Sequence, residues 1–310
     1  MAAYRFCRSD DIGLLTDALN RCWSPHFPDE PAMTPAAFKR SIRERQVWCS
    51  SCMVAFAGAD PIGVLIGAKR PSGTLVHKIA VHPEHCRQDH GRHLLTSLAS
   101  KLAILGPPRT VAEVPETLVA ACGLFAASGF REEARLTDYV LPRLDDEAQQ
   151  GAATEVPDGR FVIPVSVDDL VANGLLESQA EDSCWQRAVE TVTARKEQIA
   201  GLAVASDERI EAYLLYVTPA APSPEPADTG RGEAPREVEI VSMHSCVEDD
   251  GQRLRRLLTQ LRAPSRGPFR LPKVHPREVS QQGLDSLGFQ PDGTHLLFAA
   301  RAGSDPARAD

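Results

Sequence analysis

The sequence has no apolar run of about 18 residues or more, which is the length that would suggest a membrane-spanning helix. It also starts without the apolar core of a signal peptide. Basic residues are scarce: 34 Lys and Arg stand against 42 Asp and Glu, which gives a net charge of −8 at pH 7. This charge disfavours general binding to nucleic acid or to an anionic membrane, although a local basic site for a small anion remains compatible with it.

The eight cysteines lack the spacing of a metal site or of a disulfide framework. Cys49 and Cys52 form a Cys-x-x-Cys pair, and no second pair follows at zinc-finger distance. Five of the nine histidines lie between residues 77 and 93, but they fall on a predicted strand, loop and helix without the spacing of metal ligands. We therefore predict reduced thiols, a cytoplasmic location and no bound metal.

A chain of 310 residues is long enough for two domains. In its first half, apolar alternation and helical periodicity predict alternating strands and helices. The predicted strands are 4–8, 52–57, 61–69, 75–81, 109–114 and 136–141, and the predicted helices are 10–23, 34–45, 88–105 and 118–127. This order predicts an α/β fold in which helices cover a mixed sheet.

A similar pattern restarts after a polar, acidic segment, 144–159, that we interpret as a linker. The second set of predicted strands is 161–164, 200–206, 211–217, 238–243 and 295–300, and the predicted helices are 167–176, 251–261 and 276–287. Residues 218–236 are rich in Pro, Ala and Glu, and we interpret them as a disordered insertion between two strands.

Two spacings support an internal repeat. Four residues of the first half recur in the second half at one constant offset: Val81, Cys86, Asp89 and Gly91 correspond to Val241, Cys246, Asp249 and Gly251. The pair Gly129-Phe130 recurs as Gly288-Phe289 at almost the same offset. We therefore predict two copies of one fold, in residues 1–143 and 160–303.

The stretch from Val81 to Leu95 combines the end of an apolar strand, a proline, a polar loop with one glycine, and the start of a helix. N–H groups at such a junction point at a ligand, and the helix dipole favours an anion there. The stretch resembles, without a gap, the pyrophosphate-binding signature of the GNAT superfamily of acyl-CoA-dependent N-acetyltransferases. That signature runs Val-x-Pro, two residues, then Arg/Gln-x-x-Gly-x-Gly/Ala. Here Cys86 stands at the Arg/Gln position and Asp89 at the first Gly position, whereas Gly91 keeps the last.

The order of predicted elements is also similar to that of the GNAT fold, so the resemblance implies two tandem GNAT-type domains. The tandem layout and length resemble those of mycothiol synthases, in which the second copy is the working one. In this chain the second loop, 245–251, holds three successive acids, and Met243 replaces the expected proline. Negatively charged side chains repel a pyrophosphate, so we interpret the second copy mainly as a scaffold.

The resemblance implies acetyl-CoA or another acyl-CoA as cosubstrate, held in a splayed gap between the fourth and fifth strands of the first copy. Backbone groups of the fourth strand would pair with pantetheine, and loop N–H groups would bind the pyrophosphate. The residues implied for this are Ile79, Ala80, Val81, Arg87, Gln88, Asp89, His90, Gly91 and Arg92. Arg87 and Arg92 add positive charge, whereas Asp89 repels phosphate and is alternatively interpreted as an N-cap of the helix.

In many GNAT enzymes a Tyr five residues before the Phe of Gly-Phe protonates the leaving thiolate, but here that position holds Phe125, and Leu284 in the second copy. Tyr139, on the following strand, is the remaining candidate acid, or else an ordinary aromatic residue of the sheet. Glu113 and His77 are candidate bases because both are expected near the gap. The alternatives are a solvated strand residue for Glu113 and a satisfied sheet histidine for His77.

The sequence thus predicts an N-acetyltransferase that acts on a primary amine of a small molecule or a protein. The alternative is a catalytically retired GNAT-fold protein that binds acyl-CoA or serves as a scaffold. The fusion of two copies further predicts a monomer whose halves pair as a pseudo-dimer.

Overall fold

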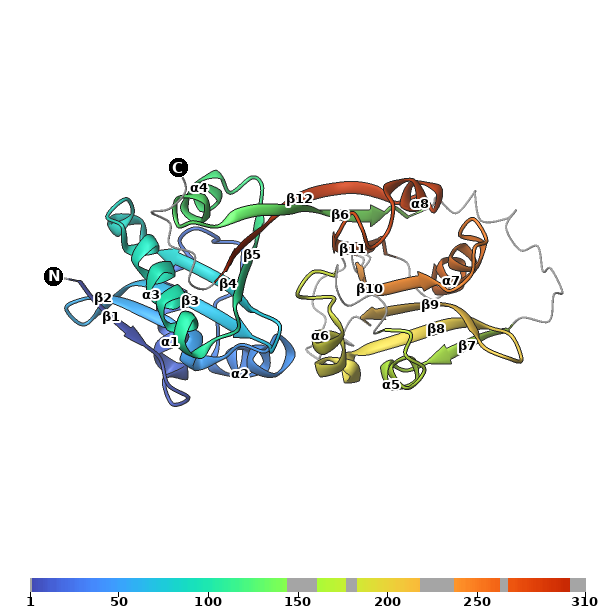
Figure 1. The fold of residues 1–310 in the computed structure, drawn as a ribbon, viewed down its shortest axis with the longest axis horizontal. Helices are drawn as coiled ribbons and strands as arrows, with labels where there is room; N and C mark the ends of the chain where they lie inside the picture. Colours follow the sequence, from blue (N-terminus) through green and yellow to red (C-terminus); the bar gives the residue numbers. More distant parts are fainter. Residues whose placement is uncertain (1, 144–160, 177–182, 218–236, 263–266, 302–310) are drawn as a thin grey trace, which may run out of the picture. The chain divides into compact units, whose positions relative to one another are not determined.

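The computed structural model describes residues 2–143, 161–176, 183–217, 237–262 and 267–301. The chain divides into two compact units, of which unit 1 comprises Met1–Arg135 and His295–Asp310, and unit 2 comprises Leu136–Thr294. The predicted linker, 144–159, and the predicted insertion, 218–236, lie outside the described residues. Figure 1 shows the elements along the chain.

Unit 1 contains the predicted alternation of strands and helices. Its elements are β1 (Ala2–Phe6), α1 (Ile12–Cys22), α2 (Pro35–Glu44), β2 (Met53–Ala57), β3 (Asp60–Lys69), β4 (Thr74–Val81), α3 (His90–Leu105), β5 (Arg109–Pro115) and α4 (Val119–Ala127). Helix α2 begins where the Thr34 side chain accepts a hydrogen bond from the N–H of Ala37, and α3 ends at Gly106. Local sequence signals therefore set these helix ends.

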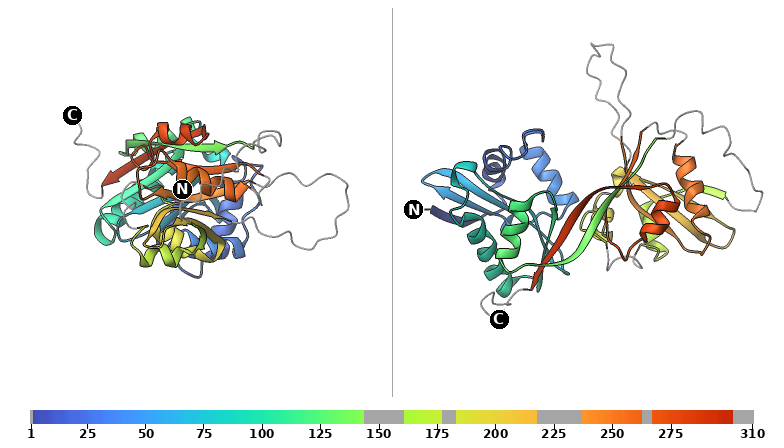
Figure 2. Two further views of the ribbon diagram at one scale, coloured as in Figure 1. Left: turned by 90° about the vertical axis from the view of Figure 1, so that its right-hand side faces the viewer. Right: turned by 90° about the horizontal axis from the view of Figure 1, so that it is seen from above.

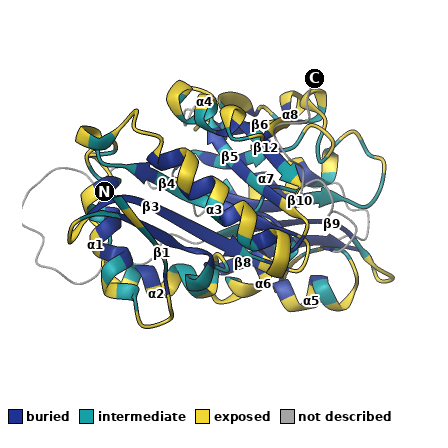
Figure 3. Ribbon diagram, turned by 60° about the vertical axis from the view of Figure 1, so that its left-hand side comes forward, coloured by how far each residue is buried: buried dark blue, intermediate teal, exposed yellow. Residues whose placement is uncertain are grey.

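The sheet of unit 1 has the order β1-β2-β3-β4-β5-β12, where β12 is Gln290–Arg301. Leu94, Leu98 and Leu102 of α3, with Phe125 of α4, pack into one apolar cluster on one face of this sheet. Helices α1 and α2 lie on the opposite face, as Figure 2 shows. Figure 3 shows that the strands between these two layers are mostly buried, whereas the outer sides of the helices are exposed.

Unit 2 repeats this plan. Its elements are β7 (Phe161–Val165), α5 (Val167–Ala172), α6 (Val189–Ala194), β8 (Ile199–Ala205), β9 (Ile210–Val217), β10 (Val238–Ser245), α7 (Gln252–Arg262), β11 (Phe269–Val274) and α8 (Gln281–Ser286). The sequence pattern did not predict α6 and β11, and it predicted a longer helix, 276–287, in place of α8. Both missed elements are short, and β11 contains Pro272, which obscures its strand pattern.

The last strand of each repeat belongs to the sheet of the other. Strand β6 (Arg131–Leu141) pairs antiparallel with β11 of unit 2, whereas β12 pairs antiparallel with β5 of unit 1, from His295–Pro115 to Arg301–Arg109. Both strands therefore run from one unit into the other. The predicted domains, 1–143 and 160–303, place β6 in the first domain and β12 in the second. In the structure, the pairing segment of β6 belongs to unit 2 and that of β12 to unit 1.

Candidate functional site

The parallel strands β4 and β5 separate after a short stretch of pairing. They are in register only at Thr74–Thr110 and Leu75–Val111. Against β3, the register of β4 shifts between its pairs at Val76 and Lys78, so His77 is the extra residue of a β-bulge. The two strands are therefore unpaired beyond Leu75 and Val111; we call this unpaired stretch of unit 1 the gap, and the bulge lies where it begins.

Main-chain groups of β4 point into the gap. His82 donates its N–H to the carbonyl of Ile62 on β3, at 2.9 Å. Because successive residues of a strand point to opposite edges, the N–H and C=O of Val81 point away from β3. The carbonyl of Val81 instead accepts a hydrogen bond from Nε2 of His26, at 2.8 Å. The exposed His26 side chain thus covers one polar group of an otherwise open strand edge.

The loop after β4 presents a row of unpaired donors. Within the described part of the chain, none of the six backbone N–H groups from Arg87 to Arg92 donates to an acceptor. The last three belong to the first turn of α3, where no intrahelical acceptor exists. Arg87 and Arg92 are exposed and form no ion pair with any described residue. Donors and positive charges in this arrangement suit an anion with several oxygen atoms.

Asp89 adopts the left-handed conformation, with φ of 60°, that the signature normally assigns to glycine. It stands at the N-cap position of α3, but its side chain forms no capping hydrogen bond. Asp89 is therefore the N-cap residue, as the alternative interpretation predicted, but its side chain does not cap the helix. The carboxylate of Asp89 adds negative charge at this position. The pKa of the Tyr4 phenol is raised above its ordinary value, mainly by burial and secondly by this nearby charge.

The first turn of α3 is held in place by its neighbours. Tyr4 bonds through its hydroxyl to Nδ1 of His90, at 2.6 Å, and stacks on His93 with ring centroids 3.7 Å apart. Gly91 is buried, and a Cβ atom there would lie 3.0 Å from Cδ2 of Leu124 on α4. Gly91 therefore lets α3 pack closely against α4, and a larger residue there would require the Leu124 side chain to shift.

Comparisons with known proteins agree with this geometry. Residues 14–130 match the family model described as the Acetyltransferase (GNAT) family. A tandem GNAT protein from the clavulanic acid biosynthesis pathway has a TM-score of 0.65 and 16% identity, over 98% of this chain and 100% of that one. A GCN5-related N-acetyltransferase from Sphaerobacter thermophilus has a TM-score of 0.64 and 15% identity, over 97% and 96% of the two chains. The whole chain therefore has the tandem GNAT fold, and residues 14–130 are similar to the GNAT family of acetyltransferases. No curated protein sequence matches this chain.

The α1–α2 face of the gap in this GNAT fold carries the two predicted bases. Ala112 and Val114 belong to the cluster under α3 and α4, so Glu113 between them faces the other side of the sheet. His77 lies on β4 with its Nε2 3.4 Å from Nη1 of Arg45, which ends α2. Glu113 and His77 therefore line the same side of the gap, on its two different strands.

A polar and aromatic group next to His77 closes this side. Lys78 lies 2.8 Å from Oε2 of Glu30, and its Nζ is 3.9 Å from the ring centroid of Trp23, which stacks on Phe27. Burial lowers the pKa of Lys78, while Glu30 acts in the opposite direction. Sequence reasoning missed this group, because its members come from β4 and from the segment between α1 and α2.

The strand exchange changes which side chains lie beside β5. Tyr139, the predicted acid, is buried in the apolar core of unit 2 and pairs with Leu271, so the structure does not bring it to Glu113 and His77. Phe298 of β12 lies in unit 1 instead and stacks on Phe125 with centroids 5.9 Å apart. Phe125 is itself buried, as is Leu284 in unit 2. None of the tyrosine positions considered from the sequence provides an acid at this gap.

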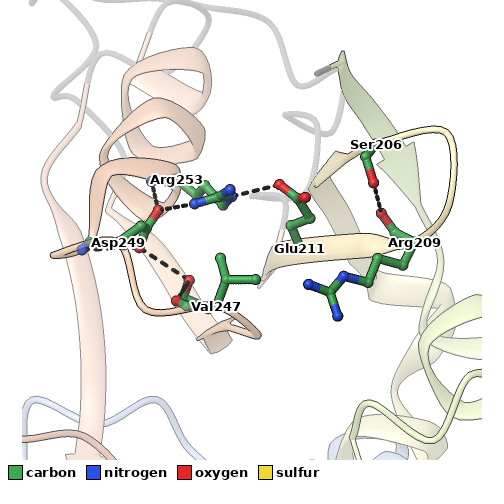
Figure 4. Close-up of polar contacts among 8 residues, drawn as sticks. Ser206, Arg209, Glu211, Val247, Asp249 and Arg253 are labelled. Carbon is green, nitrogen blue, oxygen red and sulfur yellow. Dashed lines mark hydrogen bonds and ion pairs between the residues drawn. The ribbon is translucent and has the colours of Figure 1, made fainter. Parts of the chain in front are cut away.

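The corresponding loop of unit 2 is occupied by its own carboxylate. Asp249 accepts hydrogen bonds from the N–H groups of Gly251, at 3.2 Å, and Arg253, at 2.8 Å. Its Oδ2 also pairs with Nη1 of Arg253 at 2.9 Å, while Nε of Arg253 binds Glu211 at 2.7 Å. Figure 4 shows this chain of contacts. One of the three acids that make this loop a poor pyrophosphate cradle, Asp249, thus satisfies the N–H groups of Gly251 and Arg253 internally.

Among the residues that the structure describes, no group of three or more His, Cys, Asp or Glu side chains is arranged to hold a metal ion. In the same described ranges, no helix is long and apolar enough to cross a membrane.

Proposed function

We propose that unit 1 binds an acyl-CoA, acetyl-CoA in the simplest case, and transfers the acyl group to a primary amine of a small molecule or a protein. The observation that carries this proposal is the continuity of two features: the gap at the β4 bulge and the row of free N–H groups from Arg87 to Arg92. A pantetheine chain that pairs with β4 would lead from the gap directly to these donors. The residues present therefore suit the cosubstrate that the family uses.

The residues of the gap have separate roles in this proposal. Main-chain N–H groups of β4 that point away from β3 stabilise the oxyanion that forms when the amine attacks the thioester carbonyl. Glu113 accepts the proton that the attacking amine must lose, and His77 orients the amine from the opposite strand. Solvent protonates the departing thiolate, because Phe125 occupies the usual position of the acid. All eight cysteines are free thiols, which suits the cytoplasm as the place of this activity.

The test is calorimetry of acetyl-CoA with the full chain, followed by an assay of CoA release with a panel of amines. We expect binding, and CoA release that depends on the amine and is lost in Glu113→Gln without loss of acetyl-CoA affinity. Full activity of Glu113→Gln would show that this carboxylate is not the base. Absence of acetyl-CoA binding would contradict the proposal as a whole.

A second candidate function is an acyl-CoA-binding protein without transferase activity. The observation that favours it is the loss of the acid at Phe125 together with Asp89 at a glycine position of the loop. The same experiment separates the two, since this candidate predicts binding of acetyl-CoA with no amine-dependent release of CoA.

A further inference from the structure

Unit 2 keeps the backbone geometry of an acyl-CoA gap. Its parallel strands β10 and β11 pair only at Val238–Phe269 and Glu239–Arg270. Against β9, the register of β10 shifts between Ile240 and Ser242, which makes Val241 the bulged residue. Val241 is thus the structural counterpart of His77, whereas the offset of the loop residues would pair it with Val81. The constant offset between the loop residues of the two repeats therefore does not match the structural correspondence between strands β4 and β10.

The gap of unit 2 contains the side chain of Arg187. Its Nε donates to the carbonyl of Val241, at the bulge of β10, over 3.0 Å. Its Nη1 donates to the carbonyl of Pro272 on β11, also over 3.0 Å. One guanidinium group therefore joins the two strands at the point where they separate.

The charge of Arg187 is balanced and hidden from solvent. Nη2 pairs with the carboxylate of Glu278, and the side chains of Arg187 and Glu278 are only 1% and 6% exposed. Breaking a buried pair of this kind is strongly destabilising, because it leaves a charge without a partner. The contacts of unit 1 differ: there, His26 reaches the carbonyl of Val81, and Arg45 contacts the ring of His77.

We propose that unit 2 is a self-liganded copy of the acyl-CoA site. The guanidinium of Arg187 fills the space at the bulge, and the carboxylate of Asp249 binds the N–H groups at the start of α7. The consequence is that one chain takes one acyl-CoA; this part rests on the function proposed for unit 1. The roles of Arg187 and Asp249 as internal ligands of unit 2 do not depend on the function proposed for unit 1.

Rescue by a small guanidinium tests the internal ligand directly. Arg187→Ala should lower the unfolding temperature and increase hydrogen exchange in β10 and β11, and millimolar methylguanidinium should restore both. The matched control is Arg195→Ala. It removes an ion pair between Arg195, at the end of α6, and Glu239, but it leaves the Arg187 side chain in the gap. Methylguanidinium should not restore this variant or stabilise the unaltered chain. An equal response of both variants, or none in Arg187→Ala, would overturn the proposal.

The unaltered chain provides a test that needs no variant. Calorimetry should give one acetyl-CoA per chain, and hydrogen exchange should show protection in residues 76–92 but none in 238–253. Two molecules per chain, or protection of the unit 2 loop, would overturn the proposal. Absence of any acetyl-CoA binding would contradict the function proposed for unit 1, while the methylguanidinium experiment would still decide the role of Arg187.

Discussion

At the scale of single residues, Asp89 is the clearest departure from a working GNAT loop. It combines a left-handed backbone with a negative charge at the start of α3, beside N–H groups that would bind a pyrophosphate. The left-handed conformation costs a non-glycine residue about 1–2 kcal/mol, although Asp tolerates it better than most. Asp89 therefore disfavours pyrophosphate binding in two separable ways, through the reduced access to its backbone and through its negative charge.

Replacing Asp89 separates these two effects. Asp89→Gly removes both, so we expect acetyl-CoA affinity to rise about tenfold, equivalent to about 1.4 kcal/mol. Asp89→Asn keeps the side-chain size and the tolerance of the left-handed conformation but removes the charge. Calorimetry at low and high salt should show that the gain of Asp89→Asn shrinks as salt increases, because exposed charges are screened. Weaker binding by both variants would mean that the carboxylate contacts the ligand.

Gly91 makes a prediction about packing. A Cβ atom at this position meets Leu124 at 3.0 Å, closer than side chains normally allow. Gly91→Ala gains about 1 kcal/mol of helix propensity and loses about 1–3 kcal/mol through overpacking, so we expect unit 1 to lose about 1 kcal/mol of stability. Chemical unfolding should show that the double variant Gly91→Ala/Leu124→Ala loses less stability than the sum of its single variants. Strict additivity would show that the two positions are not coupled.

At the scale of elements, the start of α7 depends on one ionised carboxylate. Burial pushes the pKa of Asp249 up, but hydrogen bonds from the Arg253 backbone and guanidinium outweigh it and leave this pKa below its ordinary value. A depressed folded-state pKa stabilises the protein above the unfolded-state pKa, which is about 3.9 for Asp. This stabilisation is lost as the pH falls through the lower, folded-state value.

The unfolding midpoint of Asp249→Asn should therefore lie below that of the unaltered chain at neutral pH, and the difference should narrow below about pH 4. Asp168→Asn is the matched control, because Asp168 pairs with Lys196 on the surface, where ion pairs contribute little. Thermal unfolding followed by circular dichroism at several pH values checks both variants. A difference between Asp249→Asn and the unaltered chain that stays constant down to acidic pH would contradict this role of the carboxylate.

At the scale of the whole molecule, the exchanged strands make each unit depend on the other repeat. Residues 1–143 lack β12, so β5 would lose its partner from Arg109 to Pro115. The cluster under α3 and α4 would also lose Leu296 and Phe298, each contributing about 1.5–3 kcal/mol when buried. An open edge of this kind promotes aggregation.

We therefore expect residues 1–143 to be poorly soluble and unable to bind acetyl-CoA, whereas a chain that ends at Arg301 should behave like the full chain. Size-exclusion chromatography and calorimetry compare the two. A monomeric, active fragment 1–143 would show that β12 is dispensable for unit 1. The pseudo-dimeric monomer that the sequence suggested remains a prediction, for which scattering of the full chain is the measurement.

Much of unit 1 could be predicted from local pattern. Apolar alternation and helical periodicity located its strands and helices, because burial of one face leaves a period that is visible in sequence. The loop from Arg87 to Arg92 was identified for the same reason, since a strand, a turn and a helix start are adjacent along the chain. The left-handed conformation at Asp89 follows from its place in this short junction.

Only the tertiary structure decided which sheet receives each last strand. The last strands of both repeats carry apolar side chains, and chain order assigned Tyr139 to the first copy, whereas the fold buries it in the second. Arg187 likewise lies far along the chain from both Val241 and Pro272, and no local pattern connects them. Periodicity records which face of an element is buried, but not the partner that buries it. For this reason the sequence determined most of the elements and the position of the loop from Arg87 to Arg92, while the fold determined which side chains lie at each gap.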